Sequence, residues 1–90
     1  MLYSIDNVKP GDMLWFEVKG ADQNFGYGEV ESVWKDKKTG IEFAFFFCQV
    51  NGGRRGGRLD KIIQKPTARM ENKLLERQRE YREAIKEFNK

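Results

Sequence analysis

Residues 41–52, IEFAFFFCQVNG, contain the longest apolar run of the chain and its strongest turn signal. Residues 41–50 are apolar on both faces of an extended chain around Phe45-Phe46-Phe47-Cys48, which predicts an interior strand covered on both sides. Asn51-Gly52 is typical of a two-residue type I′ hairpin turn, in which both residues take positive φ. The stretch therefore predicts a β-hairpin that returns through residues 54–59.

Two further strands are expected upstream. Residues 13–19 and 25–35 are rich in β-favouring side chains, and the Pro10-Gly11-Asp12 turn precedes the first of them. Gly26 and Gly28 lie in the second strand, where glycine typically marks a bulge or a sharp bend. Beyond these glycines the alternation places Val30 and Trp34 on one face. It places three residues on the other face: Glu29, Glu31 and Val33.

The downstream sequence predicts a change to helix. Residues 36–40 form a hairpin loop, and residues 60–63 a tight turn that leads into a short fifth strand. We therefore expect a small β-barrel over residues 1–65. Pro66 breaks the chain, and residues 67–90 contain neither Gly nor Pro. Residues 66–90 are thus expected to form an amphipathic, charged helix, within the same domain or appended to it.

The apolar residues of this helix recur at spacings of 4, 7, 4 and 3, which places them on one narrow stripe. The stripe is suited to packing on the barrel, to pairing with a second copy as a homodimer, or to docking on another protein. Its members are Met70, Leu74, Tyr81, Ile85 and Phe88. As a protein interface we single out the last four of these.

The composition excludes several kinds of site. The chain has no histidine and a single cysteine, Cys48, so we expect no metal centre, no disulfide, no cofactor and no nucleophilic catalysis. Cys48 is expected to be a small buried apolar residue. No signal peptide is visible and no stretch approaches the length of a membrane span, so a cytoplasmic protein that does not contact membranes is expected. These absences favour a binding protein over an enzyme.

Charge is unevenly distributed although the net charge is only +3. Residues 1–34 are acidic on balance. Residues 54–65 carry five basic side chains against Asp60 alone. Such a polarised chain can present a basic face to a partner.

The resemblance of the chain to a known fold covers roughly residues 9 to 64. Residues 9–16, KPGDMLWF, resemble the first strand of SH3-like barrels of the KOW and Tudor kind, which often begin after a Pro-Gly-Asp turn. Residues 26–33, GYGEVESV, resemble their second strand. The resemblance implies a mainly β fold, an SH3-like small antiparallel barrel, followed here by one long helix. It also implies a binding module, since such barrels bind RNA, DNA, ribosomes, RNA polymerase, peptides or methylated side chains.

The leading hypothesis is a non-catalytic accessory factor that binds nucleic acid, DNA or RNA, or associates with nucleoprotein. Residues 51–58 combine arginines, which pair with phosphates, with glycines that let a backbone approach closely. Phe25 and Tyr27 are candidates for stacking on bases. The candidate phosphate-binding residues are Arg54, Arg55, Arg58, Lys35, Lys37, Lys38, Lys61 and Lys65.

Two alternatives remain open. Trp15, Phe16, Tyr27 and Trp34 could form an aromatic cage for a methylated cation, although core packing explains them more simply. The chain could instead be a protein-interaction module, such as a phage-type or mobile-element protein that docks on a host enzyme and regulates it.

Overall fold

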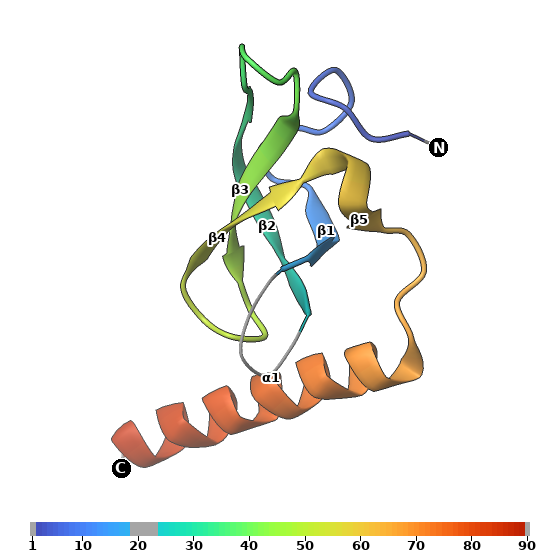
Figure 1. Cartoon of the computed structure of the whole chain (residues 1–90). Coiled ribbons are helices and arrows are strands. Elements are labelled where there is room, and N and C mark those ends of the chain that lie inside the picture. Colours follow the sequence, from blue (N-terminus) through green and yellow to red (C-terminus); the bar gives the residue numbers. More distant parts are fainter. Residues whose placement is uncertain (1, 19–23, 90) are drawn as a thin grey trace.

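The computed structural model describes residues 2–18 and 24–89. The chain forms five strands: β1 (Met13–Glu17), β2 (Phe25–Lys35), β3 (Glu42–Cys48), β4 (Arg54–Arg58) and β5 (Ile62–Ile63). A single 3₁₀ turn, η1 (Leu59–Lys61), precedes β5, and the helix α1 (Ala68–Phe88) follows it. Figure 1 shows the strands curled into a half-barrel above the helix.

The strands form one antiparallel sheet in the order β4-β3-β2-β1-β5. Each neighbouring pair from β1 to β4 is consecutive in sequence, and β5 closes onto the far side of β1. This confirms the predicted small antiparallel barrel with one C-terminal helix. In the described residues, no helix combines the length and the apolar character that a bilayer crossing requires.

The concave face of the sheet holds the core. Phe16 of β1 and Phe46 of β3 are fully buried, and their rings stack at 4.2 Å between centroids. The remaining fully or almost fully buried side chains around this pair are small or branched: Val8, Val30, Ala44, Cys48, Val50 and Leu59. Cys48 is free and buried, as predicted.

Glycine permits the close approach of strands around that core. A Cβ at Gly57 would lie 2.6 Å from the Cδ1 atom of Phe16, and a Cβ at Gly28 would collide with the backbone carbonyl oxygen of Phe47. Both positions therefore require a residue without a side chain. The bulge expected at Gly26 and Gly28 instead lies further along β2, between Val30 and Ser32.

This bulge corrects the predicted faces of β2. Beyond it, Val33 pairs with buried Ala44 and is half-buried against the core, whereas Trp34 pairs with Phe43 and is exposed. The alternation predicted Trp34 on the same face as Val30, and Val33 on the other face. The extra residue of a bulge shifts the alternation by one, so the two side chains exchange faces.

The prediction that the third strand is covered on both sides was wrong. On its inner face Ala44, Phe46 and Cys48 are fully buried, but on its outer face Phe45 is 41% exposed and Phe47 is 49% exposed. Nothing in the described chain packs over the outer face of β3 to the extent that the core covers its inner face. The β3–β4 turn also differs from the expectation: positive φ occurs at Gly52 and Gly53, not at Asn51.

The helix starts at a well-formed cap. The Thr67 hydroxyl oxygen accepts a hydrogen bond from the Met70 amide at 3.2 Å, and the Thr67 amide donates to the Met70 sulfur at 3.5 Å. Met70 is buried and Leu74 is half-buried beneath the sheet. From there the helix runs past the β3–β4 turn, and Figure 1 shows its C-terminal turns extending beyond the sheet.

Candidate functional site

The outer face of β2, β3 and β4 displays three cross-strand rows of side chains. The register aligns Glu29, Phe47 and Arg54 in one row, Ser32, Phe45 and Gly56 in the next, and Trp34, Phe43 and Arg58 in the third. Directly opposed residues of antiparallel strands place their side chains on the same face. We call the four aromatic residues of these rows, Trp34, Phe43, Phe45 and Phe47, the aromatic face.

The rings of the aromatic face pack on one another but leave much of their surface open. Trp34 stacks on Phe43 with centroids 4.8 Å apart and on Phe45 with centroids 5.8 Å apart. Trp34, Phe45 and Phe47 each expose between 41% and 49% of their surface. Contiguous exposed aromatics on a small protein typically mark a binding surface.

Gly56 keeps the middle of this surface uncovered. It lies directly opposite Phe45 on β4, where a side chain would otherwise stand beside the ring. A Cβ at this position would lie 3.5 Å from the Phe45 ring, an ordinary contact, so the fold does not require glycine here. The glycine therefore leaves the Phe45 ring accessible between Arg54 and Arg58.

The two arginines that flank the aromatic face each contact a carboxylate. The Nε of Arg54 donates to Glu31 at 3.1 Å, and the Nε and Nη2 of Arg58 donate to the two oxygens of Asp60 at 2.9 and 2.7 Å. The hydrogen bonds from Arg58 lower the pKa of Asp60, and the same hydrogen bonds raise the pKa of Arg58. Both pairs are solvent-exposed, so each contributes little to stability.

The other predicted basic residues are spread around the barrel. Arg55 pairs with Phe46, so its side chain starts on the opposite face of β4 from Arg54 and Arg58. Lys35 ends β2 and Lys37 and Lys38 lie in the β2–β3 loop, at the end of the sheet next to Trp34 and Phe43. Within the described residues none of these four basic groups forms an ion pair. The last two predicted lysines lie outside the rows, Lys61 in η1 and Lys65 between β5 and α1.

The aromatic residues named from the sequence lie elsewhere. Phe25 is buried and Tyr27 is half-buried, and both rings pack against Trp15, with centroids 6.1 and 4.8 Å away. Phe25 is therefore not available to stack on a base, which corrects that prediction. The cage is not assembled either, because Phe16 stacks in the core and Trp34 stacks on Phe43.

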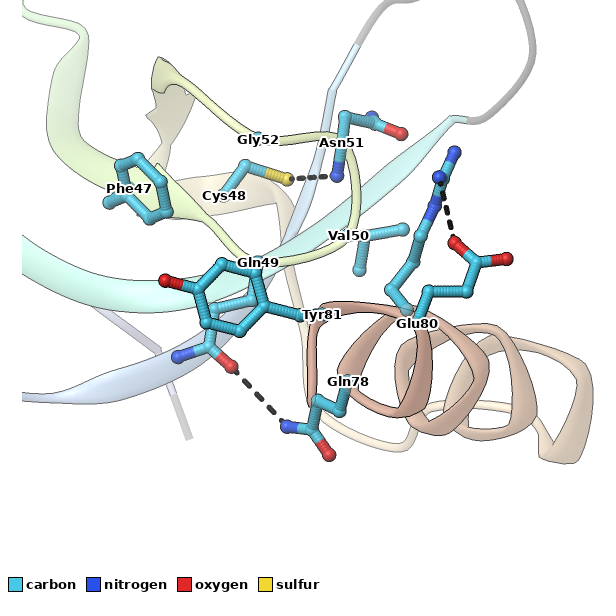
Figure 2. A pocket seen from close by; sticks show the side chains of 10 residues that line it. Phe47, Cys48, Gln49, Val50, Asn51, Gly52, Gln78, Glu80 and Tyr81 are labelled. Atoms are coloured by element: carbon cyan, nitrogen blue, oxygen red, sulfur yellow. Dashed lines mark hydrogen bonds and ion pairs between the residues drawn. The ribbon is translucent and has the colours of Figure 1, made fainter. Parts of the chain in front are cut away.

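An open groove of about 670 Å³ adjoins the lower end of the aromatic face. Phe47 forms part of its wall, together with the β3–β4 turn and one turn and a half of α1. Figure 2 shows Tyr81 reaching from the helix toward that turn, where the Gln78 side-chain amide donates to the Gln49 amide oxygen at 3.4 Å. Arg77 lines the groove as well and is held 3.3 Å from Glu80.

The predicted protein interface on the helix divides into two parts. Leu74 is half-buried next to the barrel. Tyr81, Ile85 and Phe88 are exposed, the last of them at 90%. Among the described residues, the helix therefore buries apolar side chains on its own barrel only in its first turns, and the Gln78–Gln49 hydrogen bond is a polar contact further along.

The sequence interpretation missed the aromatic face, although its signal is present. Phe43, Phe45 and Phe47 alternate along β3 and therefore share a face, and Phe45 and Phe47 are exposed there because the core covers only the opposite face. Trp34 shares this face because of the bulge in β2, and no single residue type predicts such a bulge.

Among residues 2–18 and 24–89, no group of three or more acidic or cysteine side chains is arranged to hold a metal ion. The chain matches no protein-family model, and comparisons with curated proteins and with solved structures gave no match.

Proposed function

We propose that the protein is a non-catalytic binding module for single-stranded nucleic acid and that the aromatic face is its binding surface. The observation that carries the proposal is the aromatic face, in which Trp34, Phe45 and Phe47 are exposed, with arginines along one side. Unpaired bases stack on aromatic side chains of exposed sheets, whereas bases within a duplex do not present their faces. Three rows of side chains offer room for about two or three bases.

The arrangement of charge favours one side of the aromatic face for the phosphates of a bound nucleic-acid strand. Arg54 and Arg58 stand on β4, on one side of the aromatic rows, and Glu29 stands on β2, on the other side. Phosphates would therefore lie over β4, with the bases over β3 and the end of β2. Lys37 and Lys38 lie in the β2–β3 loop, at the end of the sheet next to Trp34, whereas Lys35 directly follows Trp34 on β2 and starts on the opposite face.

The carboxylates that now pair with the arginines do not prevent phosphate binding. An exposed ion pair is worth about 0–1 kcal/mol, so a phosphate can replace Glu31 or Asp60 as the partner of the guanidinium at little cost. Arginine is also suited to bidentate contact with phosphate. Because the contacts are with the backbone and with ring faces, we expect weak preference for base sequence.

The experiment is a fluorescence-anisotropy titration of labelled single-stranded DNA and RNA, with the duplex as comparison. We expect Phe45→Ala and Phe47→Ala each to weaken single-strand binding by roughly 1–3 kcal/mol, the range for loss of a stacked base. Leu75→Ala is the matched control, because Leu75 is an exposed apolar residue of α1 and not part of the aromatic face. The result against the proposal is single-strand binding that is undetectable at low salt or is unaffected by both phenylalanine variants.

Salt dependence separates this proposal from protein binding. The balanced ion pairs Arg54–Glu31 and Arg58–Asp60, beside exposed aromatics, also fit the composition of a protein interface. With nucleic acid, the slope of log K against log salt should fall by about 0.7 for each arginine contact removed in Arg54→Ala and Arg58→Ala. If the parent binds no nucleic acid, the protein-interaction module becomes the better account.

A further inference from the structure

The Arg54–Glu31 ion pair crosses the aromatic face. Arg54 is on β4 and Glu31 is on β2, and β3 lies between these two strands in the sheet. Along β3, Arg54 is level with Phe47. Glu31 lies between the two residues of β2 that pair with Phe46 and Phe45. The contact of 3.1 Å between the Arg54 Nε and the Glu31 carboxylate therefore bridges the outer face of β3, between the positions of Phe47 and Phe45.

The bulge in β2 supplies the carboxylate at this place. Glu31 is the extra residue of the bulge, which the pairing register with β3 skips. Bulges commonly re-aim a side chain next to a functional site. Asp60, the carboxylate partner of Arg58, instead lies in η1 directly after β4, on the side where we place the phosphates. Of the two arginine-bound carboxylates, Glu31 is thus the one on the side of the bases.

We propose that Glu31 selects guanine at one position of the bound strand, an inference that rests on the proposed function and names the base that the same surface prefers. When a phosphate takes the Arg54 guanidinium, the Glu31 carboxylate loses its partner. An unpaired carboxylate beside a polyanion is unfavourable, so a base that donates hydrogen bonds to it is preferred. Each member of the ion pair then exchanges its partner for one part of the nucleotide.

Guanine is the base whose edge matches a carboxylate. Its Watson–Crick edge carries two adjacent donors, N1–H and the N2 amino group, and a carboxylate offers two acceptor oxygens. Cytosine and adenine each place an acceptor beside their amino group, and thymine and uracil place carbonyl oxygens on both sides of N3–H. Such acceptors are repelled by the second carboxylate oxygen. Arg58 and Asp60 already form the same two-donor, two-oxygen arrangement within the chain.

The preference concerns the single base that lies beside Glu31. Stacking on the aromatic rings and contacts with phosphates tolerate every base, so they add affinity without selecting sequence. A site that hydrogen-bonds its ligand discriminates strongly against a ligand that lacks the matching groups, because the polar group of the site is then left unpaired. Glu31 therefore adds one selective contact to an otherwise tolerant surface.

The test compares oligothymidylates of equal length that differ only in one central base, by fluorescence anisotropy at low salt. We expect guanine at that position to bind about fivefold or more tightly than thymine, as for other bidentate contacts with a base. Inosine keeps N1–H but lacks the N2 amino group, so its affinity should be intermediate. One guanine per strand avoids association of the strands through guanine quartets.

Two variants assign the preference to its residue. Glu31→Gln should reduce it to about twofold or less, because the amide has one oxygen and its NH₂ group opposes the second donor of guanine. Asp60→Asn is the matched control, since it also removes an exposed carboxylate from an arginine, but on the phosphate side. It should leave the preference unchanged. Circular dichroism should show that both variants fold, because both side chains are exposed.

Proton NMR of the complex reports the contact itself. The N1 proton of an unpaired guanine exchanges rapidly with water, whereas a hydrogen bond to Glu31 should give a resolved signal that Glu31→Gln abolishes. Equal affinity of the parent for all strands, a guanine preference that Glu31→Gln retains, or its equal loss in Asp60→Asn would overturn this inference and leave the proposed function standing. Failure of every strand to bind the parent at low salt would overturn both.

Discussion

The two faces of β3 differ in what their phenylalanines do. Phe46 points inward, is fully buried and stacks on Phe16, so it holds the barrel together. Phe45 and Phe47, its immediate neighbours, point outward and remain about half exposed. Burial of the inner ring removes apolar surface from water, and exposure of the outer rings keeps apolar surface in water. Folding therefore accounts for Phe46, whereas it does not account for the exposed rings of Phe45 and Phe47.

The glycines of β4 show the same division. Gly57 faces inward against Phe16, where no side chain fits, whereas Gly56 faces outward beside Phe45, where one does. The first glycine is required by packing. The second is not, and its effect is to leave the surface between Arg54 and Arg58 open. The inner face is thus constrained by the fold and the outer face is free to serve binding.

The largest expected effect is a difference in the free energy of unfolding between variants of the inner Phe46 and the outer Phe45. Phe46→Ala should lower the free energy of unfolding by about 3–5 kcal/mol, the usual cost of removing a buried phenylalanine. Phe45→Ala should cost clearly less, because much of its ring already contacts water. Urea unfolding followed by circular dichroism measures both. Equal losses for the two variants would mean that the outer face is also part of the core.

A smaller effect is expected for the two glycines. Gly57→Ala places a methyl group 2.6 Å from Phe16 and should destabilise the protein by about 1–3 kcal/mol, the range for an overpacked core. Gly56→Ala should leave stability nearly unchanged, since its Cβ meets only an ordinary contact. Thermal melts of the pair provide the comparison. A Gly56→Ala variant as unstable as Gly57→Ala would contradict the distinction.

The smallest effect concerns the outer ion pair of Arg58 and Asp60. The pKa of Asp60 is below its ordinary value of 3.8, so the pair stabilises the fold above that pH and the contribution is lost as the pH falls. Asp60→Asn should therefore melt slightly lower than the parent at neutral pH, and the difference should vanish in acid. Because the pair is exposed, the shift is small. A difference that grows toward low pH would reverse this interpretation.

The sequence predicted the elements of the fold better than its faces. Turn residues, apolar alternation and the helix-forming tail located five strands and one helix, because these signals are local. Which side chains of β2 face outward depends on the bulge between Val30 and Ser32, and whether those of β3 are exposed depends on whether a second layer covers it. Both are matters of tertiary packing, which an apolar run does not reveal. Phe25 was assigned to binding and Phe45 to the core for this reason.

The candidate site was predicted in part. Arg54 and Arg58 were chosen for their charge and glycine neighbours, and the structure places them on one face. Arg55, chosen on the same grounds, starts on the other side of β4, because successive residues of a strand alternate. The aromatic partners of the arginines were identified only once the strands had been paired.

The central claim is tested most directly by the fluorescence of Trp34. The chain has two tryptophans, and only Trp34 belongs to the aromatic face, since Trp15 packs against Phe25 and Tyr27. The account predicts that a single-stranded oligonucleotide quenches the emission of a Trp15→Phe variant, in which Trp34 is the reporter, and leaves that of a Trp34→Phe variant nearly unchanged. Equal quenching of the two variants, or none in either at low salt, would contradict it.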